Sequence, residues 1–238
     1  MICNEISANL RELADPGIAS HSQRFFKTGS GEYGEGDKFL GIRVPVIRKL
    51  VKNHASATVD DAKTLLKSEF HEERLFALLL LVALYEKGDQ YKRKAVFECY
   101  LAHTQYVNNW DLVDSSAPYI IGAYLINRNK SVLYKLSVSE SLWERRIAIM
   151  STFHFIKKGE FEDALRISER FLNDKEDLIH KAVGWMLREI GKRDLSVEKA
   201  FLDRFSPIMP RTMIHCAIEK FPEPERKKYL KGINTNPV

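Results

Sequence analysis

Apolar residues recur with helical spacing along almost the whole chain. A repeat of about 3.6 residues predicts helices that bury one face. We expect helices over residues 5–14, 43–54, 59–67, 71–87, 90–103, 109–126, 131–138, 141–158, 161–173, 176–191, 196–205 and 211–221. Short polar segments such as EKGD and KKGE separate them, and no segment alternates as a strand would. The pattern therefore predicts an all-α protein.

A glycine-rich segment, TGSGEYGEGDK at residues 28–38, interrupts this pattern and is predicted to be a loop. It lacks the motifs of phosphate-binding loops, and its three carboxylates would repel phosphate. We therefore expect a structural turn or a flexible clamp near the substrate. The last residues, 232–238, carry no apolar pattern and are expected to be loose.

Two helical segments resemble each other and indicate an internal repeat. HEERLFALLLLVALYEKGD (71–89) matches WERRIAIMSTFHFIKKGE (143–160) when Arg74 is aligned with Arg146. Their separation of 72 residues is twice 36, and the intermediate and following positions are Trp110 and Ala182. Paired helices repeating every 36 residues or so are typical of α-solenoids. We expect residues 1–238 to form a single HEAT-like solenoid of antiparallel helix pairs with a concave face.

The stretch VNNWDLVDSS, residues 107–116, carries an unusual pair of side chains. Trp110 and Asp114 are four residues apart, so a helix places them on one face. In the 36-residue register Asp114 stands where the other copies have Leu78, Met150 and Met186. A carboxylate that replaces an apolar side chain in a repeat is a candidate functional group.

The same register brings two further residues into the candidate site. If the repeats stack in order, Arg146 and Trp185 lie near Trp110 and Asp114 on neighbouring helices. Each has an ordinary structural alternative: either tryptophan could belong to the core, Asp114 could pair with Arg146, and Arg146 could cap a helix. Together they suit a cationic ligand, because indole faces and a carboxylate both attract positive charge.

Composition limits the kinds of partner and cofactor that the protein is expected to have. The net charge of +5 and the isoelectric point near 9.0 permit an anionic partner such as nucleic acid. Three scattered cysteines favour a reducing compartment over a disulfide framework. The seven histidines show no metal-ligand spacing, so no metal or other cofactor is expected.

Nothing in the sequence suggests a membrane or secreted protein. The most apolar stretch, residues 75–85, is too short to span a bilayer. The opening residues MICNEISANL lack a basic segment followed by an apolar run, so no signal peptide is expected. We therefore expect a cytoplasmic protein.

Four separated segments carry a family resemblance: FLGIRVPVIRKL (39–50), NNWDLVDSSAP (108–118), WERRIAIM (143–150) and IHKAVGWMLREIGKRD (179–194). In this order and spacing the chain resembles the AlkD-like DNA alkylation repair glycosylases, which are built from HEAT-like repeats. The resemblance implies hydrolysis of the N-glycosidic bond of 3-methyladenine and 7-methylguanine in duplex DNA, as a step of base excision repair. It implies that the duplex lies along the concave face, and that Trp110, Asp114, Arg146 and Trp185 form the catalytic set.

The implied chemistry suits these residue types. A purine alkylated at N3 or N7 is already cationic and leaves without a general acid. The enzyme must then stabilise the positive sugar and position water, which one carboxylate such as Asp114 can do. Indole faces favour the developing charge. Arg146 would hold a phosphate beside the lesion.

Further contacts to the DNA backbone are expected from basic side chains and one helix start. Lys181 and Arg188 share a helical face with Trp185. Arg211 and Thr212 follow a proline at a predicted helix start, where free N–H groups favour phosphate. The expected DNA-binding residues are Arg43, Arg146, Lys181, Arg188, Arg211 and Thr212.

Two other functions remain open at this stage. A protein of the same fold could bind damaged or branched DNA without catalysis, or a HEAT-like array could act as a protein-binding scaffold. Retention of the four candidate catalytic residues favours the enzyme. We expect it to act as a monomer.

Overall fold

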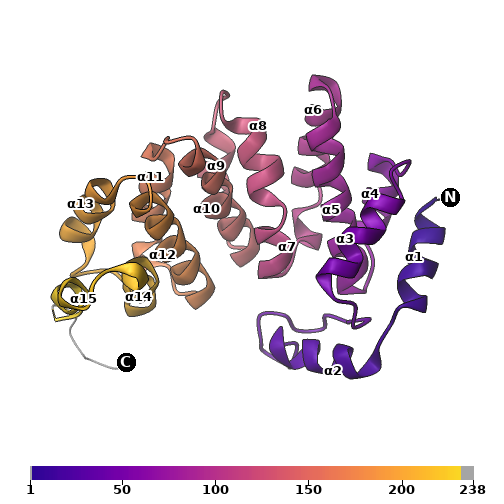
Figure 1. The fold of residues 1–238 in the computed structure, drawn as a ribbon, viewed down its shortest axis with the longest axis horizontal. Helices are drawn as coiled ribbons and strands as arrows, with labels where there is room; N and C mark the ends of the chain where they lie inside the picture. Colours follow the sequence, from indigo (N-terminus) through magenta and orange to yellow (C-terminus); the bar gives the residue numbers. More distant parts are fainter. Residues whose placement is uncertain (1, 232–238) are drawn as a thin grey trace. The chain divides into compact units, whose positions relative to one another are not determined.

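The computed structural model describes residues 2–231, so the predicted loose tail at 232–238 lies outside the described residues. Within 2–231 the chain folds into helices joined by turns (Figure 1). An isolated bridge between Lys38 and Phe70 is the nearest approach to β-structure in that range. The all-α prediction is confirmed.

The chain divides into two compact units, residues 1–124 and 125–238. The helices of the first unit are α1 (Ile2–Glu12), α2 (Pro16–Phe25), α3 (Val44–Asn53), α4 (Val59–Leu66), α5 (His71–Lys87), α6 (Gln90–Leu101) and α7 (Trp110–Asp114). The short helix α8 (Ala123–Leu125) lies at the boundary. The second unit contains α9 (Ser131–Leu136), α10 (Leu142–Lys157), α11 (Glu162–Arg170), α12 (Asp177–Gly191), α13 (Leu195–Phe205), α14 (Arg211–Ala217) and α15 (Glu223–Leu230).

Two helices were not predicted, and both bury little. The α2 helix begins at Pro16, and the Asp15 carboxylate caps it by accepting from the N–H groups of Gly17 and Ile18. None of its residues is buried. The α15 helix buries only Tyr229. Without a buried stripe neither segment shows the periodicity that identifies a helix.

The helix predicted over residues 109–126 is wrong as a single element. It ends as α7 at Asp114, and a π-helix follows over Pro118–Gly122. Two features explain the break. Pro118 has no N–H to continue the backbone pattern. The Ser116 hydroxyl donates to the Leu112 carbonyl at 2.5 Å and so competes for a helical acceptor. Asp114 therefore closes a short helix instead of lying inside a long one.

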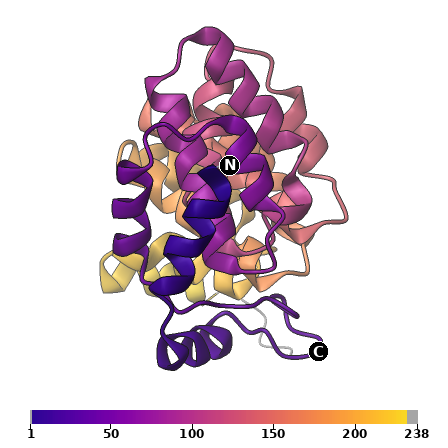
Figure 2. The ribbon, with the colours of Figure 1, turned by 90° about the vertical axis from the view of Figure 1, so that its right-hand side faces the viewer.

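The glycine-rich segment is a turn structure packed within the first unit. Gly31 and Gly36 both have φ of 77°, which a side chain would disfavour. A Cβ at Gly34 would lie 2.4 Å from the Phe26 carbonyl oxygen. At the end of the segment Asp37 is buried. Figure 2 shows α2 and this loop running together at one edge of the first unit.

The start of α5 holds this N-terminal region through buried charges. The Glu72 carboxylate accepts hydrogen bonds from the backbone N–H groups of Leu40, Gly41 and Ile42 at 2.7–3.2 Å. Its neighbour Glu73 forms an ion pair of 3.2 Å with Arg11 of α1. A buried carboxylate is stable only with such donors, so these residues fix the segment after the loop.

The repeat of about 36 residues varies in length from one copy to the next, so a fixed step of 36 does not align equivalent positions. The helices α5, α7, α10 and α12 begin at His71, Trp110, Leu142 and Asp177, so successive starts are 39, 32 and 35 residues apart. Counted from these starts, Asp114 and Arg146 are both the fifth residue of their helices. The comparison of Asp114 with Met150 therefore paired residues at different helical positions.

Side-chain contacts give the same corrected register. Arg74 donates from Nη1 to the Ser68 carbonyl at 2.9 Å, and Arg145 donates in the same way to the Ser139 carbonyl at 3.0 Å. In both cases the serine precedes the arginine by six residues. Arg145, and not Arg146, is thus the counterpart of Arg74, at a separation of 71 residues. The motif WERR contains two adjacent arginines, and the sequence alignment used the second of them instead of the first.

Candidate functional site

Trp110 is the first residue of α7, and the structure places its indole partly exposed. The preceding residue, Asn109, is fully buried, and its side-chain oxygen accepts from the Trp110 N–H at 2.9 Å. The indole stacks on Phe26 with ring centroids 5.2 Å apart and meets Phe25 edge-on at 5.9 Å. Because these contacts leave part of the ring open, Trp110 is both anchored and available to a ligand.

Asp114 is the last residue of α7 and is half-buried. A carboxylate at a helix C-terminus meets the negative end of the helix dipole, which disfavours it by about 0.3–1 kcal/mol. It lies near the fully buried Tyr100, whose pKa is raised by burial and, to a smaller extent, by the charge of Asp114.

A buried network of charges supports Trp110 from within the first unit. His71 donates from Nδ1 to Asp37 and from Nε2 to Asp111, both at 2.8 Å. Arg74 forms an ion pair of 2.5 Å with the other oxygen of Asp37. Since Asp111 follows Trp110 in α7, the network joins the end of the glycine-rich loop to the helix that carries the indole.

These contacts set the protonation of the network. Burial would lower the pKa of His71, but the adjacent Asp111 and Asp37 outweigh it and raise that pKa to about 9. Burial opposes ionisation of Asp37, yet hydrogen bonds and charge from His71 and Arg74 lower its pKa. At neutral pH the cluster therefore holds a protonated histidine between two carboxylates.

The network was not predicted from the sequence, although one signal was present. Four consecutive ionisable residues, HEER at 71–74, open the most apolar helix of the chain, and all four are buried. Ionisable side chains are rarely buried without partners. The run could therefore have indicated a buried polar cluster, but not the identity of its partners.

Arg146 lies in α10 of the second unit and is buried, with 5% of its surface exposed to solvent. Its Nη1 donates to the backbone carbonyl of Leu178 in α12. That bond ties two neighbouring helices together and orients the guanidinium. The structure thus gives Arg146 a structural role beside the phosphate contact expected of it.

Trp185 lies in α12 and is half-buried. Its Nε1 donates to Glu189 at 3.4 Å, and its ring is 5.9 Å from that of Phe153. Its neighbours Gly184 and Met186 are buried. Trp185 therefore lies on the less buried side of α12, as a residue that meets a ligand must.

The expected DNA-binding residues differ in how they are engaged. Arg43 is exposed just before α3, and its side chain forms no ion pair or hydrogen bond with another described residue. In α12, Lys181 pairs with Asp177 at 2.6 Å, and Arg188 pairs with Glu219. Exposed ion pairs contribute only about 0–1 kcal/mol, so such cations can exchange a carboxylate for a phosphate.

The remaining two candidates open α14 as predicted. Arg211 is exposed, and its Nε donates to His215 at 3.3 Å. Thr212 hydrogen-bonds to Asp177 and helps to lower the pKa of that carboxyl against the effect of burial. Because α14 is a single short helix, we expect its side chains rather than its dipole to contact an anion.

The structure divides the four predicted catalytic residues between the two units. Trp110 and Asp114 lie together on α7, as their spacing predicts, whereas Arg146 and Trp185 belong to the second unit. Among residues 2–231 no cluster of His, Cys, Asp and Glu side chains could hold a metal ion. The same residues include no helix long and apolar enough to cross a membrane.

Comparison with known proteins identifies the family to which the chain belongs. The family model described as DNA alkylation repair enzyme matches residues 6–221, and the chain belongs to this family. Comparison with curated proteins gives no match.

Two solved structures share the fold. A predicted DNA alkylation repair enzyme from Enterococcus faecalis is 16% identical, with a TM-score of 0.67, over 88% of this chain and 97% of that one. The crystal structure of smu.31 from Streptococcus mutans UA159 is also 16% identical, with a TM-score of 0.53, over 87% of this chain and 100% of that one. At this identity the two structures indicate a common fold.

Proposed function

We propose that the protein is a DNA glycosylase that releases cationic alkylated purines, such as 7-methylguanine and 3-methyladenine, from duplex DNA. The observation that carries this proposal is the pair on α7. A partly exposed indole and a half-buried carboxylate stand four residues apart on one short helix. In a chain of the DNA alkylation repair enzyme family, such a pair suits the cationic sugar that forms when the base leaves.

In the proposed mechanism the alkylated base departs with its own positive charge, so no general acid is required. Asp114 stabilises the positive charge that develops on the deoxyribose and orients the water that attacks it. The faces of Trp110 and Trp185 favour the same charge. Arg146 positions a phosphate next to the lesion.

The mechanism draws two of its four residues from each unit. It also predicts selectivity: a neutral lesion has a poor leaving group, and nothing in the proposed set protonates it. The test is the release of free base from duplex DNA that contains 7-methylguanine. Tight binding without release would favour the non-catalytic DNA-binding alternative.

Replacing Trp185 with alanine is expected to slow base release by more than tenfold while the protein stays folded. A fully buried tryptophan would cost about 3–5 kcal/mol of unfolding free energy when truncated, but Trp185 is half-buried. Thermal unfolding and single-turnover release, measured on the same preparation, separate the two effects. Trp143→Ala is the matched control, since Trp143 is also a half-buried tryptophan of the second unit. A large loss of stability with normal release would assign Trp185 to the core.

Affinity for undamaged duplex is expected to fall steeply with salt. Five cations, Arg43, Arg146, Lys181, Arg188 and Arg211, are proposed to contact phosphates. Releasing that many counterions predicts a loss of about 10²–10³-fold between 50 and 200 mM salt. Fluorescence anisotropy of a labelled duplex measures it. Arg211→Gln should reduce the slope by about one, whereas Arg166→Gln, outside the proposed set, should not. A salt-independent affinity would contradict backbone-directed binding.

A further inference from the structure

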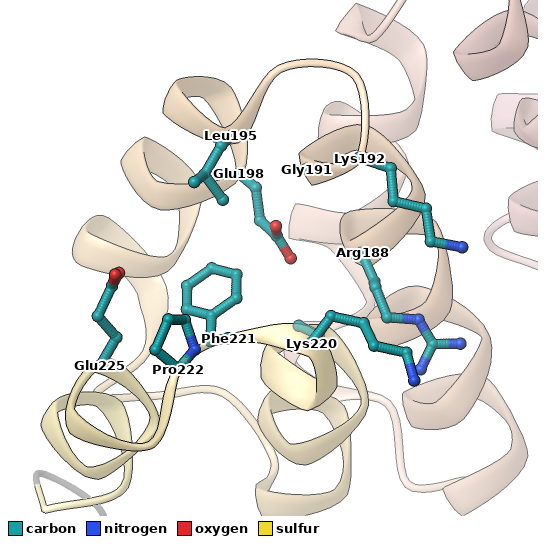
Figure 3. A pocket seen from close by; sticks show the side chains of 10 residues that line it. Arg188, Gly191, Lys192, Leu195, Glu198, Lys220, Phe221, Pro222 and Glu225 are labelled. Atoms are coloured by element: carbon teal, nitrogen blue, oxygen red, sulfur yellow. The ribbon is translucent and has the colours of Figure 1, made fainter.

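A pocket of about 180 Å³ opens between α12, α13 and the start of α15, entirely within the second unit (Figure 3). Leu195, Phe221 and Pro222 form its apolar side. Arg188, Lys192 and Lys220 line it with cations. None of the four proposed catalytic residues contributes to it, although Arg188 is also a proposed DNA contact.

A single buried carboxyl group points into this pocket. Glu198 reaches from α13, with Phe221 on one side and Arg188 and Lys220 on the other (Figure 3). The residue is 1% exposed, and its Oε1 has no hydrogen-bond partner among the described residues. A Cβ at Gly191 would lie 1.6 Å from Glu198 Oε2, so the carboxyl needs a glycine opposite it. An unpartnered buried carboxyl is costly.

The protonation state of Glu198 decides what it can recognise. Burial raises its pKa to about 8, although Arg188 and Lys199 act in the opposite direction. At pH 7 the side chain is therefore a neutral carboxylic acid, which presents one donor and one acceptor side by side. A carboxylate would present two acceptors.

We propose that this pocket binds a nucleoside monophosphate unit, with the edge of its base on Glu198 and its phosphate at Arg188, Lys192 and Lys220. Adenine carries an adjacent donor and acceptor, which complement a neutral carboxyl. The pocket is smaller than the sites of drug-sized ligands, at about 300–1,000 Å³, and suits one flat ring system against Phe221. Three cations around the carboxyl disfavour a cationic ligand.

The phosphate contacts are available at low cost. Lys192 pairs with Glu189 at 2.5 Å and Lys220 with Glu219 at 2.9 Å, and both lysines are at least half exposed. The Lys220 pair is exposed on both sides, and such pairs contribute about 0–1 kcal/mol. Glu189 is buried, but it keeps Arg193 as a partner at 3.1 Å when Lys192 leaves. The Nε of Arg188 is buried without a partner. A phosphate can therefore replace the carboxylate partners of these cations.

The test is calorimetric titration of the full chain with AMP at pH 7 and pH 9. Both values lie above the second phosphate pKa of about 6, so the ligand keeps its charge. The ionisable groups facing Glu198 are Arg188 of α12, Lys192 directly after α12, Lys199 of α13, Lys220, and Glu225 and Tyr229 of α15. Wild-type affinity is expected to fall by up to about tenfold between the two pH values, because ionised Glu198 can no longer donate a hydrogen bond to the ring nitrogen of adenine.

Two variants make the test specific. Glu198→Gln keeps one donor and one acceptor and cannot ionise, so it should bind AMP equally at both pH values. Glu198→Leu should lose about tenfold or more at pH 7. Glu162→Gln, at an exposed carboxylate of α11 outside the pocket, is the matched control and should behave as wild type. Circular dichroism confirms that each variant is folded.

A second ligand distinguishes the source of the nucleotide. If a short single-stranded oligodeoxyadenylate competes with AMP in the wild type and in Glu198→Gln, the pocket takes a nucleotide of a DNA strand. If AMP binds and the oligonucleotide does not compete, the pocket takes a free nucleotide. Both results support the proposal. Absence of AMP binding, or equal affinity of wild type and Glu198→Leu, would overturn it and leave the pocket to water.

Discussion

Replacing Asp114 with asparagine is expected to reduce the single-turnover rate of 7-methylguanine release by about 10²–10³-fold, or about 3–4 kcal/mol in activation free energy. The change preserves the shape of the side chain and removes its charge. Affinity for lesion-containing duplex should hold or improve, because a negative charge facing the phosphates is removed. Release kinetics and a binding titration on the same protein measure both effects.

Asp111→Asn is the matched control for this prediction. Asp111 is a carboxylate on the same short helix, but it accepts from His71 at 2.8 Å and belongs to the buried network. Its replacement should lower the free energy of unfolding and leave release per folded molecule within a few-fold of wild type. Normal release by folded Asp114→Asn would contradict the catalytic assignment of Asp114.

Replacing Asp37 with alanine is expected to lower the free energy of unfolding by about 3–5 kcal/mol, because it leaves buried cations without a partner. Asp37 is 7% exposed and binds both His71 and Arg74. Urea denaturation measures the loss, and Asp60→Ala, at an exposed carboxylate of the same unit, is the control. Unfolding of Asp37→Ala at the wild-type free energy would contradict the role assigned to the network.

The same network predicts how stability depends on pH. The folded-state pKa of His71, about 9, lies above its ordinary value of 6.5. The stabilisation is therefore complete below pH 6.5 and is lost as the pH rises through 9. The pKa of Asp37 is lowered from 3.8, so its contribution is present above that value and is lost on acidification. In Asp37→Ala the alkaline loss should be smaller than in wild type. Unfolding at a series of pH values tests this difference.

The helices that the sequence predicted well are those with a deeply buried stripe. For α5 the predicted and observed bounds coincide, for α10 they differ by one residue at each end, and for α12 they differ by one residue at the start. The α2 and α15 helices were missed because they bury no residue and one residue, respectively. An apolar repeat in the sequence reflects burial of one helix face, so a helix that buries almost nothing lacks that repeat.

In the candidate site, too, some features could be predicted from the sequence and others could not. Trp110 and Asp114 were identifiable because a helix brings residues four apart onto one face, and this depends only on local structure. The pairing of His71 with Asp37 and Asp111 was not, because those residues are 34 and 40 positions away in the chain. Which long-range partners meet depends on how α2, the glycine-rich loop and α7 pack around α5. The sequence alignment paired Arg146 with Arg74 incorrectly because it assumed a fixed repeat length, whereas the segments between helices vary in length.

The most direct test of the proposed function is single-turnover release of free base by the wild-type protein from two duplexes, one with 7-methylguanine and one with the neutral lesion hypoxanthine at the same position. The proposal predicts release of 7-methylguanine and little or no release of hypoxanthine, because only the cationic base leaves without a general acid. Absence of 7-methylguanine release from duplex that the protein demonstrably binds, or equal release of both bases, would contradict it.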